Sequence, residues 1–190
     1  EFVDQLSREE GYRYIDAVVE PQLIAGVGTY TLEILEDLPD ADVIVVPVGG
    51  GSGACGACIV AKAVNPDIQV IGVQAEQAPA AFLSWQEGKV VQAPMRSQAE
   101  GLATGTGFEL TLGILREHLD DFILVTEEEM DRAIIHHLEK THNLTEHAGA
   151  ASLAGAIKIK DRLEGKKVVL IMSGGNISMD HLKSALAKYS

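Results

Sequence analysis

The sequence predicts an α/β fold with a mainly parallel open sheet and helices on both faces. Three apolar runs of strand length, at 42–47, 68–73 and 167–172, are typical of strands that are covered on both sides. Segments with helical patterns lie between these runs, and strands that alternate with helices form parallel sheets. The chain has 190 residues, which suffices for one domain, or one and a half, with a sizeable core.

The N-terminal region predicts a helix, a strand and a loop before the first buried run. The helix covers 2–10 and is ended by Gly11, and the strand covers 12–18. A glycine-containing loop is expected at 25–28. Thr29 is suited to cap the helix that follows it.

The rest of the chain continues the alternation of helices and strands. Thr126 and Glu129 have the spacing of a capping box, which marks the start of a helix. A short strand is expected at 122–125, and glycines make the segment 88–106 irregular. The remaining predicted helices cover 54–64, 79–87, 108–119, 126–140, 149–163 and 178–187.

Composition limits the classes of partner. With 15 basic and 28 acidic residues, the formal charge is −13, which argues against binding to nucleic acid or to an anionic membrane. The uncharged stretch 43–61 is not a membrane span, because its proline and five glycines would leave backbone groups unpaired in lipid. Two cysteines and the lack of a basic, cleavable N-terminal segment predict a cytoplasmic protein.

The strongest local feature is the glycine loop at 46–56, which leaves a predicted strand and opens a helix. Glycines let the backbone approach an anion closely, and the helix N-terminus favours negative charge. The alternative is a tight turn without a ligand. Five glycines in the eight positions 49–56 exceed what a turn requires, so the loop predicts a phosphate site.

Two kinds of phosphate ligand remain open at this loop. Residues 51–56 match G-x-G-x-x-G, and Glu76 ends the next strand about 20 residues on, as in nicotinamide-dependent Rossmann oxidoreductases. A second loop, Ser173–Asn176, also leaves a predicted strand, and one dinucleotide site does not need it. Two such loops would converge at one crevice of an open sheet. A Walker-A loop is excluded because no Gly-Lys-Ser/Thr follows.

Other chemistry-bearing residues are expected to be structural. Cys55 and Cys58 form a C-x-x-C pair, but they lie in a run of small residues, which favours helix packing over a redox dithiol. Two cysteines cannot form a four-thiolate zinc site. Four histidines and a glutamate lie close together in the sequence, but their spacings match no metal-binding motif. We expect most of these side chains to be solvated; they are His136, His137, His142, Glu146 and His147.

Five segments together resemble the pyridoxal-phosphate enzymes of fold type II, the tryptophan synthase β-like architecture, and within it the threonine/serine dehydratase and serine racemase group. They occur in the family's order and cover nearly the whole chain; they are 24–29, 46–53, 99–102, 146–151 and 172–176. The resemblance implies that 1–20 is the end of a small domain. It also implies that 21–190 is the C-terminal portion of the large cofactor-binding domain, with the N-terminal part missing.

The resemblance implies a site for pyridoxal 5′-phosphate. The phosphate would be held by Gly49, Gly50, Gly51, Ser52 and Gly53. Gly101 would place main chain beside the pyridine ring, and Glu146 would be an acid on the substrate side. Ser173 would hydrogen-bond the pyridine nitrogen, and the pocket would be shaped by Gly174, Gly175 and Asn176.

The activity implied by the resemblance is that of a threonine/serine dehydratase. Such an enzyme removes the Cα proton and then the β-hydroxyl of a serine- or threonine-like amino acid, which yields a 2-oxo acid and ammonia. Racemisation of the same amino acids is the alternative within the family. The resemblance also implies a homodimer whose ligand is a small amino acid.

The sequence departs from the family pattern in four places. The family's Schiff-base lysine lies in a Ser-x-Lys-x-Arg stretch, which is absent; Lys160-Asp161-Arg162 mimics part of it but is predicted to be a solvated helix face. The 190 residues alone are therefore expected to be inactive, and a non-catalytic phosphate-binding fragment stays an alternative. Ser52 and Gly53 replace a glycine and a bulky apolar residue, and His147 replaces a proline.

The fourth departure concerns a cation site that some relatives have. Glu76 and the Ala80 carbonyl match that site, but Phe82 stands where a carboxylate is expected. We therefore expect no metal.

Overall fold

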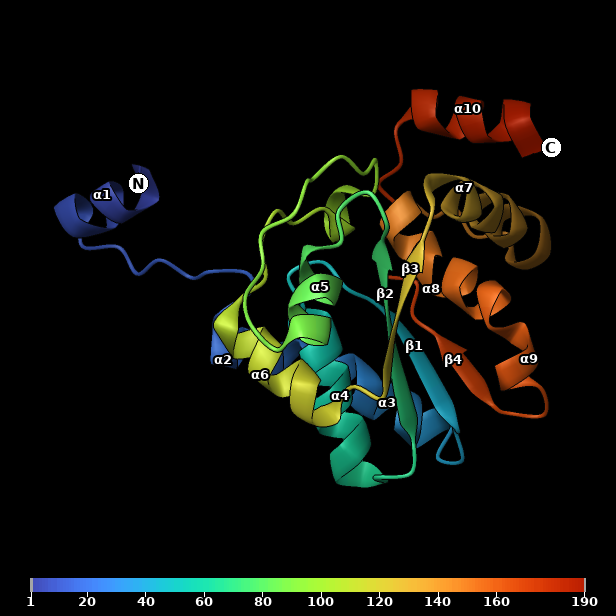
Figure 1. Cartoon of the computed structure of the whole chain (residues 1–190), viewed down its shortest axis with the longest axis horizontal. Coiled ribbons are helices and arrows are strands. Elements are labelled where there is room, and N and C mark those ends of the chain that lie inside the picture. The colour runs from blue at the N-terminus through green and yellow to red at the C-terminus, as the bar shows by residue number, and fades with distance from the viewer. Residues whose placement is uncertain (1, 190) are drawn as a thin grey trace.

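A computed structural model describes residues 2–189. Four strands form one parallel sheet in the order β3-β2-β1-β4: β1 (Val43–Pro47), β2 (Gln69–Ala75), β3 (Asp121–Val125) and β4 (Val168–Leu170). Val43 lies opposite Gln69 on one side and Val168 on the other. The parallel α/β sheet predicted from the sequence is confirmed (Figure 1).

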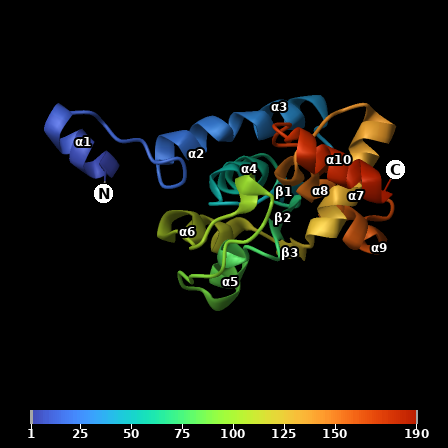
Figure 2. The same ribbon diagram turned by 90° about the horizontal axis from the view of Figure 1, so that it is seen from above.

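Helices cover both faces of the sheet, as predicted (Figure 2). One layer contains α2 (Pro21–Val27), α3 (Thr29–Asp37), α4 (Ser52–Val64), α5 (Ala80–Glu87) and α6 (Glu109–His118). The other contains α7 (Glu127–His136), α8 (His147–Lys158), α9 (Lys160–Leu163) and α10 (Met179–Tyr189). The shorter turns are the 3₁₀ turn η1 (Glu100–Leu102) and the π turn η2 (His137–Thr141). No described helix has the length and apolar character needed to cross a membrane.

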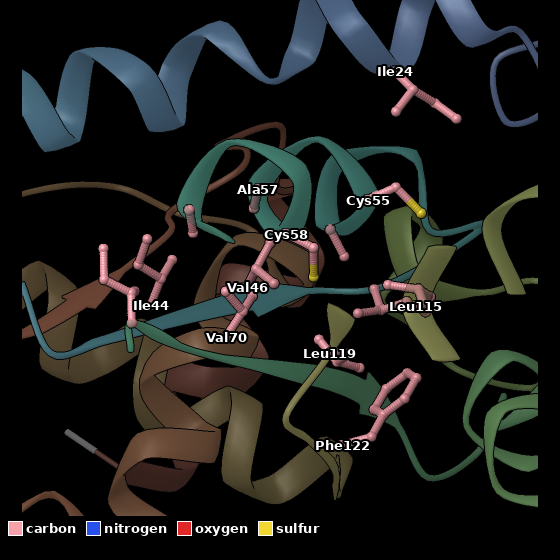
Figure 3. Close-up of a cluster of buried hydrophobic side chains, with 14 of the residues drawn as sticks. Ile24, Ile44, Val46, Cys55, Ala57, Cys58, Val70, Leu115, Leu119 and Phe122 are labelled. Carbon is pink, nitrogen blue, oxygen red and sulfur yellow. The ribbon is translucent and has the colours of Figure 1, made fainter. Parts of the chain in front are cut away.

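Both faces of the central strand are apolar because each face meets a different core. Ile44 and Val46 of β1 point into the core beneath α4, shown in Figure 3, whereas Val43 and Val45 point into the core beneath α8. All four side chains are buried, and each contributes about 1.5–3 kcal/mol relative to exposure. A strand buried on both faces therefore has a continuous apolar run instead of an alternating one.

The two cysteines lie inside the α4 core (Figure 3), where they pack as small residues as predicted. Burial raises the pKa of Cys55 and of Cys58 to about 12, so both thiols stay protonated at neutral pH. We expect a thiol reagent such as dithionitrobenzoate to label neither cysteine in the native protein and both in urea. Labelling of the native protein at the rate of the unfolded chain would contradict this.

The N-terminal region differs from the prediction. Residues 12–18 form no strand; Tyr12, Tyr14 and Ile15 are exposed, and no described strand lies beside them to complete the hydrogen bonds. This segment and α1 (Phe2–Glu10) extend away from the sheet (Figure 1). The loop predicted at 25–28 is also wrong, since Gly28 has helical angles (φ −60°, ψ −23°) and joins α2 to α3.

Thr29 does not act as the predicted cap. It lies within α3, and its hydroxyl donates to the Gly26 carbonyl of the preceding helix. Ala25–Gly28 therefore forms a helix junction, and Gly28 allows close contact with Gly56 of α4.

The second half of the chain matches the prediction more closely. The Thr126–Glu129 capping box is confirmed, with both reciprocal hydrogen bonds present. The helix predicted over 149–163 is interrupted at Ile159 (φ −110°, ψ 20°), which separates α8 from α9. The strand predicted as buried at 167–172 is shorter and only half-buried, because β4 pairs on one side with β1 and lies at the sheet edge.

Candidate functional site

The candidate site lies where the strand order reverses direction. From β1 the sheet grows through β2 and β3 on one side, while β4 lies on the other. In open parallel sheets, ligands bind outside the carboxyl ends of the strands at this switch point. Gly49–Gly53 follow β1 and Ser173–Asn176 follow β4, so the two predicted loops meet there.

A cavity of about 160 Å³ opens between the two loops. Its walls come from the β1 loop, the start of α4, the turn η1 and the loop after β4. The lining residues are Pro47, Gly49, Gly50, Gly51, Ser52, Gly53, Gly101, Leu102 and Ser173. The structure thus brings together the predicted phosphate loop, Gly101 and Ser173.

The glycine loop has a shape that side chains would destroy. Gly51 has φ +102°, a left-handed conformation that few non-glycine residues adopt. A Cβ atom on Gly49 would collide with the carbonyl oxygen of Gly101 on the opposite wall. The cavity therefore depends on bare backbone at these two positions.

The carbonyl groups of the glycine loop are held by neighbouring side chains. The Thr111 hydroxyl donates to the Gly50 carbonyl at 2.8 Å, and the Tyr30 hydroxyl donates to the Gly53 carbonyl at 2.9 Å. The first N–H groups of α4 have no partner within the helix, as at any helix N-terminus. N–H groups and a helix dipole that converge on a small cavity suit the phosphate of a cofactor.

The loop after β4 is bound to the segment that leads into α8. The Gly174 carbonyl accepts the Glu146 N–H at 3.1 Å and the Thr145 hydroxyl at 2.9 Å. Glu146 is the N-cap residue of α8, and its carboxylate lies directly against Gly174. A Cβ atom on Gly175 would lie 2.8 Å from the Leu144 carbonyl oxygen. The predicted acid and the predicted Ser173 loop therefore lie side by side.

A second, polar cavity of about 80 Å³ adjoins this contact. Asn176, the last residue of the predicted loop, lines this cavity rather than the first. Its charged and titratable lining residues are Glu100, Glu146, His147 and His181.

Two of the four clustered histidines are not solvated as predicted. His147 is 2% exposed, and its Nε2 lies 3.0 Å from Oδ1 of Asp131. His137 is also buried, at the start of η2, whereas His136 and His142 are exposed. The partner of His147 is 16 residues away on another helix, so no local pattern indicates this pair.

Glu76 and Phe82 occupy two positions of the cation site that some relatives have. Glu76 is exposed at the end of β2, and its N–H donates to the Val125 carbonyl. Phe82 packs edge-on against Phe122 with ring centroids 5.6 Å apart. Within residues 2–189, no group of three His, Cys, Asp or Glu side chains could hold a metal ion.

All nine lysines lie within the described residues, and none of them lines the cavity between the glycine loops. Lys160 and Arg162 are exposed on α9, and Arg162 pairs with Asp121 at 2.8 Å. The prediction that the Lys160–Arg162 stretch is a solvated face is confirmed.

The geometry of the site does not decide between pyridoxal phosphate and a dinucleotide. The order β3-β2-β1-β4 is also that of the first strands in Rossmann dinucleotide-binding folds, and Glu76 stands at the end of β2 as a ribose-binding acid would. The choice therefore depends on which proteins share this sequence and fold.

Comparisons with known proteins decide between these ligands. Residues 1–174 match the family described as "Pyridoxal-phosphate dependent enzyme". The chain is 36% identical over 185 residues to an L-threonine ammonia-lyase of Thermotoga maritima, which covers 97% of this chain and 46% of that protein. The chain spans about half the length of the curated relatives it matches.

Solved structures agree with this match. The processed form of threonine deaminase isoform 2 from Solanum lycopersicum superposes with a TM-score of 0.92 at 30% identity, over 96% of this chain and 54% of that one. Serine racemase from Dictyostelium discoideum superposes with a TM-score of 0.87 at 35% identity, over 94% of this chain and 58% of that one. The chain therefore belongs to the pyridoxal-phosphate dependent enzyme family and has the fold type II architecture that the sequence predicted.

Proposed function

We propose that this protein, at its natural full length, is a pyridoxal-phosphate dependent threonine/serine dehydratase. It would convert a β-hydroxy amino acid into a 2-oxo acid and ammonia. The observation that carries the proposal is the cavity at the switch point, where the glycine loop of β1 faces Ser173. Relatives named threonine ammonia-lyase and threonine deaminase support this reaction.

The phosphate group is assigned to the backbone of Gly49–Gly53. Its charge would be met by N–H groups and the α4 N-terminus, since no lysine lines the cavity, and Thr111 and Tyr30 hold the loop carbonyls. Such an arrangement would let a chain of formal charge −13 bind an anionic cofactor without a basic side chain. When bound, pyridoxal phosphate supplies the electron sink for loss of the Cα proton.

The residues around the ring are assigned to orientation. The Ser173 hydroxyl is proposed to hydrogen-bond the pyridine nitrogen as a neutral partner, and the main chain of Gly101 is proposed to lie beside the ring. Gly174 and Gly175 leave room for the neighbouring 144–146 segment, and Asn176 closes the adjoining cavity.

Glu146 is assigned to the substrate side. Its N–H is fixed by the Gly174 carbonyl, and its half-buried carboxylate lies between the Ser173 loop and the polar cavity. A carboxyl group in this position can hold or release a proton next to the departing hydroxyl.

Further parts of the proposal come from the family resemblance. We propose that residues 1–20 end a small domain, that 21–190 form the C-terminal portion of the large domain, and that the Schiff-base lysine lies outside these 190 residues. The exposed side chains of Tyr12, Tyr14 and Ile15 are consistent with a segment that packs on another domain. We also propose a cytoplasmic homodimer.

The test is a product assay on the natural full-length protein with L-serine, L-threonine and their D-forms. We expect a 2-oxo acid and ammonia from the L-forms, and no product after the cofactor is removed with hydroxylamine. Interconversion of the enantiomers as the main reaction would instead support the racemase alternative, which the Dictyostelium discoideum neighbour favours. A protein that binds the cofactor but forms neither product would contradict both.

A further inference from the structure

Asp131 is a buried carboxylate that joins three helices. It lies on α7 and is 4% exposed. Its Oδ1 lies 3.0 Å from Nε2 of His147, the first residue of α8, and its Oδ2 accepts from Nζ of Lys188 on α10 at 3.0 Å. Burial of a carboxylate costs free energy unless polar partners compensate, and here the partners of the two oxygens come from two other helices.

Further contacts hold α10 against the same two helices. The ring of His181 meets that of His147 edge-on, with centroids 5.3 Å apart. The guanidinium of Arg132, next to Asp131 on α7, lies 5.2 Å from the ring centroid of Tyr189, and Ala185 is fully buried. Figure 2 shows α10 lying across α7 and α8. Contacts therefore hold α10 in place from His181 near its start to Tyr189 at its end.

Both helices that Asp131 holds lead directly into the candidate site. His147 follows Glu146 in the chain, and only Ile177 and Ser178 separate Asn176 from α10. The two approaches also touch, because the Glu146 N–H donates to the Gly174 carbonyl at 3.1 Å. A shift of α8 or α10 relative to α7 would therefore change the position of Glu146 relative to the Ser173–Asn176 loop.

Asp131 can influence the site only through these partners. It lines neither the glycine-loop cavity nor the polar cavity, whereas His147 and His181 line the polar one. The hydrogen bond to Asp131, together with the negative charge of that carboxylate, raises the pKa of Lys188, so the amine stays charged across the physiological range.

We propose that Asp131 is a positioning residue that fixes Glu146 and the Ser173–Asn176 loop relative to each other by binding His147 and Lys188. The roles of Glu146 and of Ser173 rest on the proposed function, but the link between the three helices does not. Loss of the Asp131 carboxylate should loosen both the Glu146 segment and the Ser173–Asn176 loop, and it should weaken cofactor binding.

The test compares Asp131→Asn and Lys188→Met with Lys158→Met in the natural full-length protein. Lys158→Met is the matched control, because Lys158 of α8 also binds an α7 carboxylate, Glu129 at 3.2 Å, but at the other end of α8. Hydrogen exchange is measured without cofactor at the Glu146 amide and along α10. The dissociation constant of pyridoxal phosphate is measured separately.

We expect Asp131→Asn to speed exchange at least tenfold at both places and to weaken cofactor binding at least fivefold. Lys188→Met should speed exchange in α10, and Lys158→Met should change neither quantity. The proposal would be overturned if both variants, Asp131→Asn and Lys188→Met, showed unchanged exchange along α10 and at the Glu146 amide. If Asp131→Asn does not fold, Lys188→Met decides, because that amine is half-exposed.

The exchange readout separates this proposal from the proposed function. Faster exchange in the variants of a protein that binds no pyridoxal phosphate would support the role of Asp131 and contradict the cofactor assignment. Normal exchange in variants of an active dehydratase would do the reverse.

Discussion

Gly51→Val is expected to lower the affinity for pyridoxal phosphate at least tenfold, about 1.4 kcal/mol. Gly51 adopts φ +102°, where a β-branched residue is strained by about 1–3 kcal/mol. Its Cβ would also lie 3.0 Å from Cβ of Thr111, whose hydroxyl holds the Gly50 carbonyl. The backbone must therefore rotate, which redirects the N–H groups assigned to the phosphate.

The measurement is a fluorescence titration of natural full-length protein with the cofactor, accompanied by a thermal melt. Gly113→Ala is the control, because Gly113 lies inside α6, away from the cavity, and a Cβ there would meet no atom within 4 Å. This control should keep the affinity and gain up to about 1 kcal/mol of stability from helix propensity. Wild-type affinity in a folded Gly51→Val protein would remove the phosphate from this loop.

Ser173→Asp is expected to lower 2-oxo acid release on the order of tenfold or more. The wild-type hydroxyl is neutral and lines the cavity opposite the glycine loop. A carboxylate beside the pyridine nitrogen would raise the pKa of that nitrogen, because its negative charge stabilises the protonated ring. With the cofactor bound, a protonated ring would be a stronger electron sink, which would shift the reaction away from elimination.

Rates and product ratios from L-serine and L-threonine check this expectation. Ser173→Thr keeps the hydroxyl at an exposed position and should retain most of the activity. Wild-type rates and ratios in Ser173→Asp would show that this residue does not face the ring nitrogen.

The sheet and the meeting of the glycine loops were predictable because they depend on local patterns. Continuous apolar runs mark strands that are covered on both faces, and the Thr126–Glu129 capping box acts over three residues. Because β1 and β4 are parallel neighbours, their carboxyl ends lie side by side. The loops that follow them, Gly49–Gly53 and Ser173, therefore meet as a consequence of the strand order alone.

The errors arose where tertiary contacts decide the local structure. Residues 12–18 have the composition of a strand but no described neighbour to pair with, and Gly28 is helical because close packing against Gly56 favours a junction without side chains. His147 has the sequence context of a surface histidine, although its partners Asp131 and His181 come from helices distant in sequence. Contacts between side chains on helices that are distant in sequence leave no periodic signal.

The phosphate assignment is tested most directly by an experimental structure of the natural full-length protein with pyridoxal phosphate bound. We expect phosphate oxygens about 2.7–3.2 Å from backbone nitrogens of Gly49–Gly53, with the ring extending toward Ser173. A phosphate held by lysine or arginine side chains, or lying outside the cavity between the two glycine loops, would contradict it.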